Sequence, residues 1–256
     1  MSPIRMYLLL AVVAACVGCS TRQGHGLEAA PAPLLDGGAD GYSFGWMTDS
    51  PNAPVFHVLD TESSLGPYAN QTKTVTLKDL VKMHGHPCDG LVTAACALSV
   101  GLRALYPHGV IDRTDTGGVC NNSPCYGDAV AYLTGGRIRF GTQKIDPSLG
   151  NEFMVYRFST GRAVQVALKA GVFPAELAAL EKKIRGGSFS EEEMRRCQLM
   201  QWEYAKKLVS RPLTESFTVS TVTGFVWQPD PYPYLGKRGD IINKDCLKTA
   251  VPPGLR

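Results

Sequence analysis

Past its first 19 residues the 256-residue sequence has no C-x-x-C pair, and nowhere does it have the C-x-x-C-H motif that attaches c-type haem. It also has no basic stripe: Lys and Arg nearly balance Asp and Glu at a net charge of +3, which excludes a dedicated nucleic-acid binder. It has no internal repeat, and beyond the N-terminus no apolar run is long enough to cross a membrane. With 44% hydrophobic residues, the chain can nevertheless bury a sizeable core.

The N-terminus has the features of an export signal. Arg5 precedes an apolar run over residues 7–17 that is too short to span a bilayer, and small residues then lead into Cys19. The ending CVGC resembles a bacterial lipobox, in which the last Cys is acylated, although Cys16 stands where Leu is usual. We therefore expect residues 1–19 to be a signal peptide with a lipobox and Cys19 to be lipidated. A plain secretory signal and a retained anchor are the alternatives.

A lipobox predicts that the mature chain is in the cell envelope, anchored by acyl chains that contribute roughly 0.8 kcal/mol per buried CH₂. Ser20 follows the expected lipidated Cys, and by analogy with bacterial lipoprotein sorting this predicts the outer membrane in a cell that has one. Residues 20–55 are rich in Gly, Pro, Ala and Asp and show no sustained period. We expect them to form a flexible tether to a folded domain over residues 56–256.

Within that domain, helical and strand-like patterns mix without strict alternation, which predicts an α+β fold. Helical spacing, with stop signals at Pro107 and Gly135, predicts helices over residues 76–83, 89–107 and 126–135 and a helical hairpin over 174–210. Apolar–polar alternation predicts strands within residues 55–61, 109–120, 137–147, 151–168 and 215–228. Thr76 is a candidate helix cap, and Ser190 with Glu193 forms a capping-box signature. A Pro-rich C-terminal extension follows.

The stretch KMHGHPCDGL holds three potential metal ligands at spacing two, His84, His86 and Cys88. In an extended segment their side chains would share one face. Cys88 comes directly before a predicted helix, whose free N–H groups stabilise a thiolate. Imidazole and thiolate together suit zinc, iron or copper rather than magnesium or calcium. The spacing alone also fits two turn histidines with a buried or disulfide-bonded Cys.

A second stretch, CNNSPCYGDA, repeats this arrangement: Cys125 follows a proline at the start of a predicted helix, and Asp128 comes three residues later. Two helix N-termini that face one point could hold a metal between His86, Cys88 and Cys125. The alternatives are a local disulfide between Cys120 and Cys125 and an ordinary first-turn carboxylate at Asp128. The pairing of the remaining cysteines cannot be read from the sequence.

The two motifs together resemble the E-type domain of formylmethanofuran dehydrogenase, the FmdE or FwdE-like family. That family has an apolar lead-in to His-Gly-His-x-Cys-x-Gly and a long helix, matched by residues 80–105, then Cys-x-x-Asp-Ala and Thr-Gly, matched by residues 125–136. The resemblance covers about residues 74–220. It implies an α+β domain with a mixed or antiparallel sheet, packed helices and a helical hairpin.

The resemblance also implies a transition-metal site, with zinc as the expected ion. Its ligands on this chain would be His86, Cys88 and Cys125, with His84 as a fourth ligand or a supporting partner. Asp128 would orient a ligand or bind a metal-bound water.

The sequence departs from the family in lacking a Cys-rich zinc ribbon at its end and in having Asp89 where Pro is usual. Export also separates it from the cytoplasmic molybdenum or tungsten enzyme, so the resemblance carries over the fold and the metal site but not the reaction. Three functions stay open: a metal-binding lipoprotein that serves a redox or metal-handling system, a metal-dependent enzyme with His84 or Asp128 as acid–base group, and a thiol-redox or small-molecule binding module. The membrane is the expected partner, nucleic acid is not, and a homodimer and a redox or small-molecule partner stay open.

Overall fold

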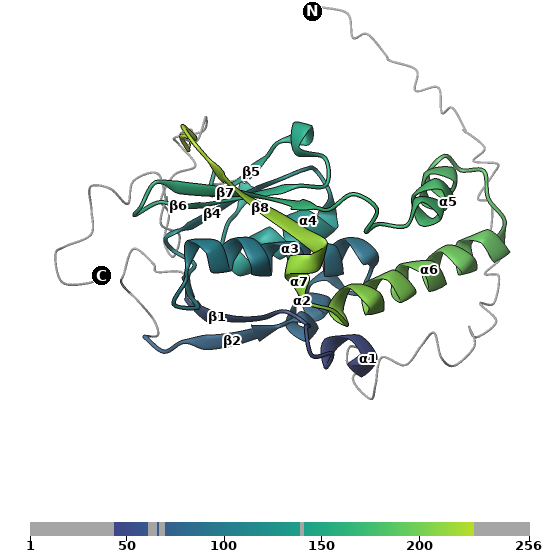
Figure 1. Ribbon diagram of the computed structural model, residues 1–256, viewed down its shortest axis with the longest axis horizontal. Coiled ribbons are helices and arrows are strands. Elements are labelled where there is room, and N and C mark those ends of the chain that lie inside the picture. Colours follow the sequence, from purple (N-terminus) through teal and green to yellow (C-terminus); the bar gives the residue numbers. More distant parts are fainter. Residues whose placement is uncertain (1–43, 61–65, 67–69, 139–140, 228–256) are drawn as a thin grey trace, which may run out of the picture.

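The computed structural model of the chain describes residues 44–60, 66, 70–138 and 141–227 (Figure 1). The expected signal peptide with Cys19, the first part of the expected tether and the Pro-rich extension with Cys246 lie outside these residues. In the described part the architecture is α+β, as predicted, with a layer of helices between a larger and a smaller sheet (Figure 1). No helix in these ranges is long and apolar enough to span a membrane.

The larger sheet is mixed. Its strands lie in the order β5-β4-β6-β7-β8; β5 runs parallel to β4, and the other neighbours are antiparallel. In chain order these strands are β4 (Thr116–Cys120), β5 (Gln143–Ile145), β6 (Phe153–Arg157), β7 (Arg162–Leu168) and β8 (Phe217–Val222). β6 and β7 form an antiparallel hairpin within residues 151–168, where the alternating pattern predicts strands, and a 3₁₀ turn (Pro147–Leu149) precedes it.

The smaller sheet has three strands in the order β2-β1-β3. They are β1 (Val55–Leu59), β2 (Lys73–Thr76) and β3 (Val110–Asp112). β1 pairs antiparallel with β2 and parallel with β3, so the chain passes through a helical segment between these two parallel strands. This sheet covers the side of the helical layer that faces away from the larger sheet (Figure 1).

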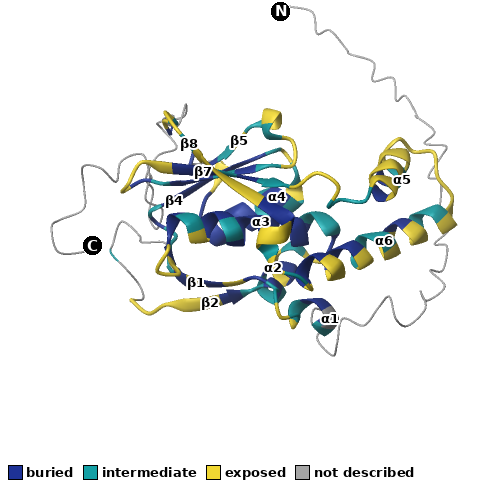
Figure 2. Ribbon diagram, in the orientation of Figure 1, coloured by how far each residue is buried: buried dark blue, intermediate teal, exposed yellow. Residues whose placement is uncertain are grey.

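Helix α3 (Asp89–Leu105) lies at the centre of the domain and is buried along most of its length (Figure 2). Its interior is rich in Ala and Leu, and Leu98 and Leu102 are fully buried. A helix that is apolar on all sides is stable only when neighbours enclose it. The helix ends at Leu105, two residues short of the predicted bound at the stop signal Pro107.

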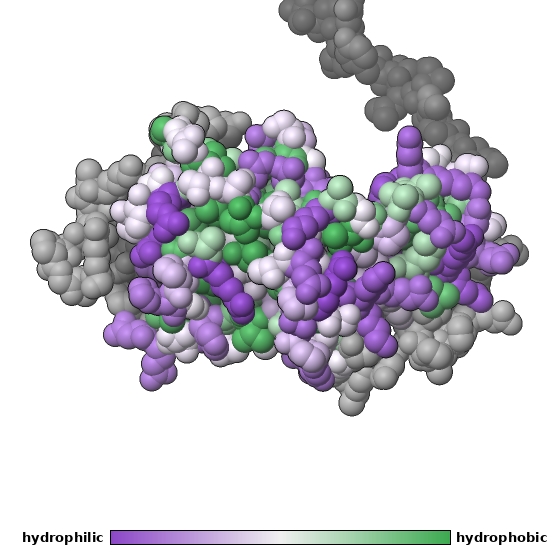
Figure 3. All heavy atoms as spheres, viewed as in Figure 1, coloured by the Kyte–Doolittle hydropathy of each residue, from purple (hydrophilic) through white to green (hydrophobic). Residues whose placement is uncertain are grey.

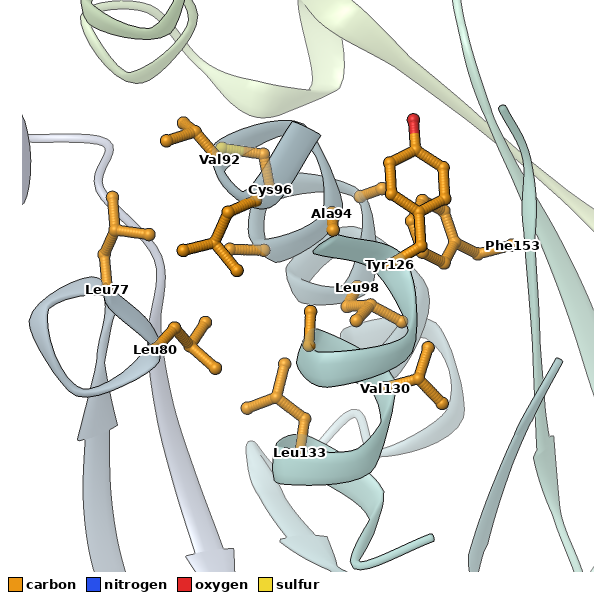
Figure 4. Packing of buried hydrophobic residues seen from close by; sticks show 14 of the residues in the cluster. Leu77, Leu80, Val92, Ala94, Cys96, Leu98, Tyr126, Val130, Leu133 and Phe153 are labelled. Atoms are coloured by element: carbon orange, nitrogen blue, oxygen red, sulfur yellow. The ribbon is translucent and has the colours of Figure 1, made fainter. Parts of the chain in front are cut away.

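Two further helices, α2 (Leu77–His84) and α4 (Pro124–Thr134), lie against α3. Figure 4 shows Leu77 and Leu80 of α2 on one side of this core and Val130 and Leu133 of α4 on the other. Helix α2 begins at Thr76, as predicted, because Asp79 accepts hydrogen bonds from the Thr76 backbone N–H at 2.8 Å and hydroxyl at 2.7 Å. Burial of their apolar faces fixes where the ends of α2 and α4 lie.

Glycines allow helices to lie directly on the larger sheet. A Cβ atom at Gly101 of α3 would lie 2.6 Å from Cγ2 of Val166 and 3.2 Å from Cγ2 of Val155. In the same way, a Cβ atom at Gly118 of β4 would lie 2.4 Å from Cγ1 of Val130 in α4. These distances are shorter than van der Waals contact, so the packing requires residues without side chains at both positions.

The predicted helical hairpin projects from one side of the body (Figure 1). Its helices are α5 (Ala175–Arg185) and α6 (Glu191–Val209), followed by the one-turn α7 (Leu213–Ser216). Ion pairs between Arg196 and Glu176 and between Lys183 and Glu193 join α5 to α6. The predicted capping box is present, because the Glu193 N–H donates to the Ser190 hydroxyl at 3.2 Å and the Glu193 carboxylate accepts from the Ser190 N–H at 3.0 Å.

The folded domain begins before the expected end of the tether at residue 55. A one-turn helix α1 (Gly45–Thr48) packs against α6, where the Phe44 ring lies 6.0 Å from the Trp202 ring. Met47 is fully buried, and the Ser50 hydroxyl donates to the Val209 carbonyl at 2.7 Å. Residues 44–54 therefore belong to the domain. The Gly- and Pro-rich composition of these residues does not predict this, because a few apolar side chains are enough to anchor the segment on the surface that α6 already provides.

We expect Gly101→Ala to lower the free energy of unfolding by about 1–3 kcal/mol, because the new methyl group overpacks the contact between α3 and the sheet. The matched control is Gly127→Ala in α4, where a Cβ atom would meet only the Gln143 side chain at 3.7 Å. That change should be neutral or stabilising by up to ~1 kcal/mol, because Ala favours helix. Chemical denaturation measures both; equal effects at the two positions would contradict the packing argument.

Candidate metal centre

The first candidate ligands lie at the junction of α2 and α3. His84 is the last residue of α2, Gly85 turns the chain with φ of 101°, and Cys88 is the N-cap of α3. The expectation of one extended segment is therefore wrong, because a helix end and a tight turn carry these residues. The turn nevertheless brings them together: ligand atoms of His84, His86 and Cys88 all lie within 4.8 Å of one another, and this group could hold a metal ion.

The second sequence stretch meets the first at its cysteine. Cys125 is the second residue of α4, after Pro124, and its Sγ lies 3.3 Å from Sγ of Cys88. Cys88 Sγ also accepts a hydrogen bond from the backbone N–H of Leu91 at 3.3 Å. Both sulfur atoms thus lie at helix N-termini, where free N–H groups and the helix dipole favour the thiolate. The two helix N-termini face one point, as expected from the sequence.

Asp128 lies behind this cluster. Its carboxylate is 2.8 Å from Nδ1 of His84, and Nε2 of the same ring is 3.7 Å from Sγ of Cys88. A carboxylate that accepts a hydrogen bond from Nδ1–H keeps the proton on Nδ1 and leaves Nε2 unprotonated. A neutral imidazole with a free Nε2 lone pair is the form that binds metals. Asp128 is therefore placed to orient His84 toward the sulfur atoms.

The two thiols differ in their affinity for a proton. The pKa of Cys125 is lowered to about 6, mainly because the Cys88 thiol donates a hydrogen bond to it and secondarily because His84 lies nearby. The pKa of Cys88 is raised by the same hydrogen bond and by burial. The pair therefore holds one proton between two sulfur atoms near neutral pH. Burial, together with the neighbouring His84 ring, also lowers the pKa of His86, which favours its neutral, ligating form.

Gly90 permits the close approach of the two cysteines. A Cβ atom at this position would lie 3.1 Å from both Cβ and Sγ of Cys125 and 3.8 Å from Sγ of Cys88. Any side chain there would press on the cysteines. Close packing against the cysteines therefore explains why the His-Gly-His-x-Cys-x-Gly motif ends in glycine. The spacing of the motif alone does not show this.

Asp89, next to the cluster, interacts with Glu181 of α5, a contact that was not predicted from the sequence. The pKa of Asp89 is raised to about 7, first by burial and then by the neighbouring Glu181 of α5. Glu181 is only 9% exposed and accepts hydrogen bonds from Gln201 at 2.8 Å and Arg185 at 3.3 Å. One sequence signal exists: Glu181 follows the buried Leu177 by four residues and so lies on the apolar face of its helix.

The five cysteines within the described ranges are all free thiols. The alternative of a local disulfide between Cys120 and Cys125 is therefore not realised. Cys120 is fully buried, with the Gln143 amide 4.0 Å from its sulfur. Cys96 is a fully buried core residue of α3, and Cys197 is a buried residue of α6.

Comparison with known families agrees with the motifs. Residues 83–218, just over half of the chain, match the family described as "FmdE, Molybdenum formylmethanofuran dehydrogenase operon". The chain belongs to the FmdE family. The match begins at the residue before His84 and ends within β8, so it includes the four candidate ligands and Asp128. The resemblance drawn from the two sequence motifs is therefore confirmed.

Among solved structures, this FmdE chain is similar to an FmdE-like protein of tungsten formylmethanofuran dehydrogenase type from Syntrophus aciditrophicus. The identity is 18% and the TM-score 0.38, and the alignment covers 64% of this chain and 78% of that one. No match is found among the curated proteins.

In metal-free protein we expect iodoacetamide to alkylate Cys125 well before the other described cysteines. Because its pKa is lowered to about 6, the thiolate is the main form above that pH, and the rate should fall only as pH drops through 6. Peptide mass spectrometry between pH 5 and 9 would follow the reaction. Cys88→Ala removes the donated hydrogen bond and should move the midpoint upward. A midpoint of about 8–9 in the unmodified protein, as for an ordinary thiol, would contradict the expectation.

Proposed function

We propose that this FmdE protein is an exported, lipid-anchored metal-binding protein that holds one zinc ion between His84, His86, Cys88 and Cys125. The observation that carries the proposal is the convergence of two imidazoles and two thiols from three helix ends. The ligand atoms of the first three lie within 4.8 Å of one another, and the fourth is 3.3 Å from Cys88 Sγ.

The donor set supports zinc. Two sulfur and two nitrogen donors form a common ligand set of four-coordinate zinc and are unsuited to magnesium or calcium. The Sγ–Sγ separation of 3.3 Å is far above the roughly 2.05 Å of a disulfide. It lies closer to the about 3.8 Å expected for two thiolates on one tetrahedral zinc with bonds of about 2.3 Å. Cys88 and Cys125 would therefore fit one ion with a small outward shift of the two sulfur atoms.

The protein surroundings support binding at this place rather than nearby. Asp128 would keep His84 in the ligating tautomer, and removal of such a supporting carboxylate typically weakens metal affinity roughly 10–100-fold. The N-termini of α3 and α4 would stabilise the thiolates that an ion requires. When bound, zinc would supply a fixed positive charge and Lewis acidity.

The count of donors favours metal handling over catalysis. Catalytic zinc sites usually have three protein ligands and keep one position for water, whereas four protein ligands close the site. A role as sensor, carrier or accessory factor for a redox or metal-handling system agrees with a closed site. An enzyme would need one of the four groups to stay unbound, with His84 or Asp128 then serving as acid or base.

One observation favours a second candidate function, a thiol-redox module. Sγ of Cys88 and Sγ of Cys125 lie close enough that a modest backbone movement would allow a disulfide to form. Its formation would pass two electrons and the one proton that the pair shares to a partner disulfide, which would take its second proton from water. Metal ligation by these thiols and a disulfide between them exclude each other, so one measurement separates the two candidates.

We expect the purified protein without its signal to contain about one zinc per chain, and we expect His86→Ala or Cys88→Ser to lower that content several-fold. Matched controls are His57→Ala, an exposed histidine of β1, and Cys120→Ala, a buried cysteine outside the cluster. Both controls should retain the metal. Elemental analysis gives the content, and thiol titration with mass mapping gives the redox state. Unchanged metal content in both ligand variants, or a disulfide between Cys88 and Cys125 in protein as isolated, would refute metal binding here.

The envelope location rests on the N-terminal motif. We expect Cys19→Ser to abolish incorporation of labelled fatty acid and to shift the protein out of the membrane fraction in a bacterial host. Cys16→Leu should leave acylation unchanged, because it places the usual residue at this lipobox position. An unmodified Cys19 with the chain in the soluble envelope fraction would instead indicate a plain secretory signal.

A further inference from the structure

The C-terminal half of α3 borders a groove that the metal site does not use. Two hollows, of about 370 and 550 Å³, share Ser99 and Arg103 as lining residues. The larger hollow lies between α3, residues 51–54, residues 212–214 and Val219 of β8. Figure 3 shows apolar residues gathered at the centre of this face, where β8 crosses in front of α3.

The strand beside this groove has an open edge. β8 pairs with β7 on one side, and it is the last strand of its sheet. Within the described part of the chain no strand pairs with its other side, and residues 218–221 are exposed. Its sequence, FTVSTV, has neither the charge nor the proline that usually protects an edge strand from further pairing. Within the described residues, this edge is therefore open to pairing with another strand.

The register of β8 links this edge to the groove. Val219 pairs with Val166, whose side chain contacts α3, so Val219 lies on the same face of the sheet and lines the larger hollow. It is 37% exposed because no described neighbour covers it there. A strand added beside β8 would continue this face, and every second side chain of that strand would point toward the hollow.

The charge of Arg103 indicates which kind of ligand the groove would bind. Arg103 makes no hydrogen bond or ion pair with any described residue, and neither hollow is lined by an acidic residue. Its place in the last turn of α3 is favourable for a cation, but the guanidinium group has no anionic partner among those residues. A carboxylate on the ligand would supply that partner.

We propose that β8 and the groove beneath it bind an extended peptide segment of a partner protein, with apolar residues at alternating positions and an acidic side chain opposite Arg103. Backbone hydrogen bonds to the β8 edge would provide affinity, and the hollow and Arg103 would provide selectivity. This site is separate from the metal centre: Arg103 and Cys88 are 15 residues apart on one helix, or about 22 Å. Loss of metal and loss of peptide binding can therefore be told apart.

The probe is a phage-displayed library of random heptapeptides, selected against the immobilised full-length chain in detergent. We expect selection of sequences that alternate apolar residues and contain Asp or Glu. For one selected peptide, fluorescence anisotropy should show that Arg103→Gln and Val219→Lys each weaken binding at least roughly tenfold, since both charge and groove contribute. The controls are Arg195→Gln, an exposed arginine on α6, and Ser220→Lys, on the other face of β8. They should change affinity by less than about twofold, and all variants should retain metal content and melting temperature.

Three results would overturn the proposal. The first is a library that yields no such sequences. The second is peptide binding that Arg103→Gln, a surface change that leaves the fold intact, does not weaken. The third is a concentration-dependent dimer, seen by sedimentation, that Val219→Lys dissociates, because β8 would then pair with β8 of a second copy.

Discussion

The enclosure of α3 between two sheets is the constraint on which the rest of the structure depends. A helix so rich in Ala and Leu is stable only with apolar neighbours over most of its surface, and after its first two residues only Val100, Arg103 and Ala104 are partly or fully exposed. The larger sheet, α2, α4, α6 and the smaller sheet supply them. Gly101 allows this helix to lie directly against β6 and β7. Because the helix cannot shift without opening the core, Cys88 at its N-terminus occupies a fixed position.

Features determined by nearby residues could be predicted from the sequence. The spacing of Leu98 and Leu102, the caps at Thr76 and Ser190 and the alternation in β6 and β7 each depend on a few neighbouring side chains. The predicted helices and strands therefore lie close to their expected places. The α+β class followed from their mixture, and the motifs led to the FmdE family.

Features determined by distant contacts could not be predicted in this way. The parallel position of β5 beside β4 and the separate three-stranded sheet depend on where buried helices place the chain. The short helix that contains Met47 is stable only against α6, which comes much later in the sequence. In the site, spacing identified the ligand types, but the turn after His84, the steric role of Gly90 and the pairing of Asp89 with Glu181 all required the fold. The carboxyl group of Asp89, at the N-terminus of α3, has a buried partner on α5 in Glu181, so this contact joins the core to the hairpin.

The four candidate ligands differ in how firmly the fold holds them. Cys88 and Cys125 belong to the ends of core helices, and His84 is clamped by Asp128, whereas His86 lies on an exposed turn. An ion at this site would therefore exchange through the His86 side, by release of one mobile imidazole, while the sulfur atoms stay in place. In the proposed site the two fixed thiolates would hold the ion, and the exposed turn would govern how fast the ion could pass to another ligand.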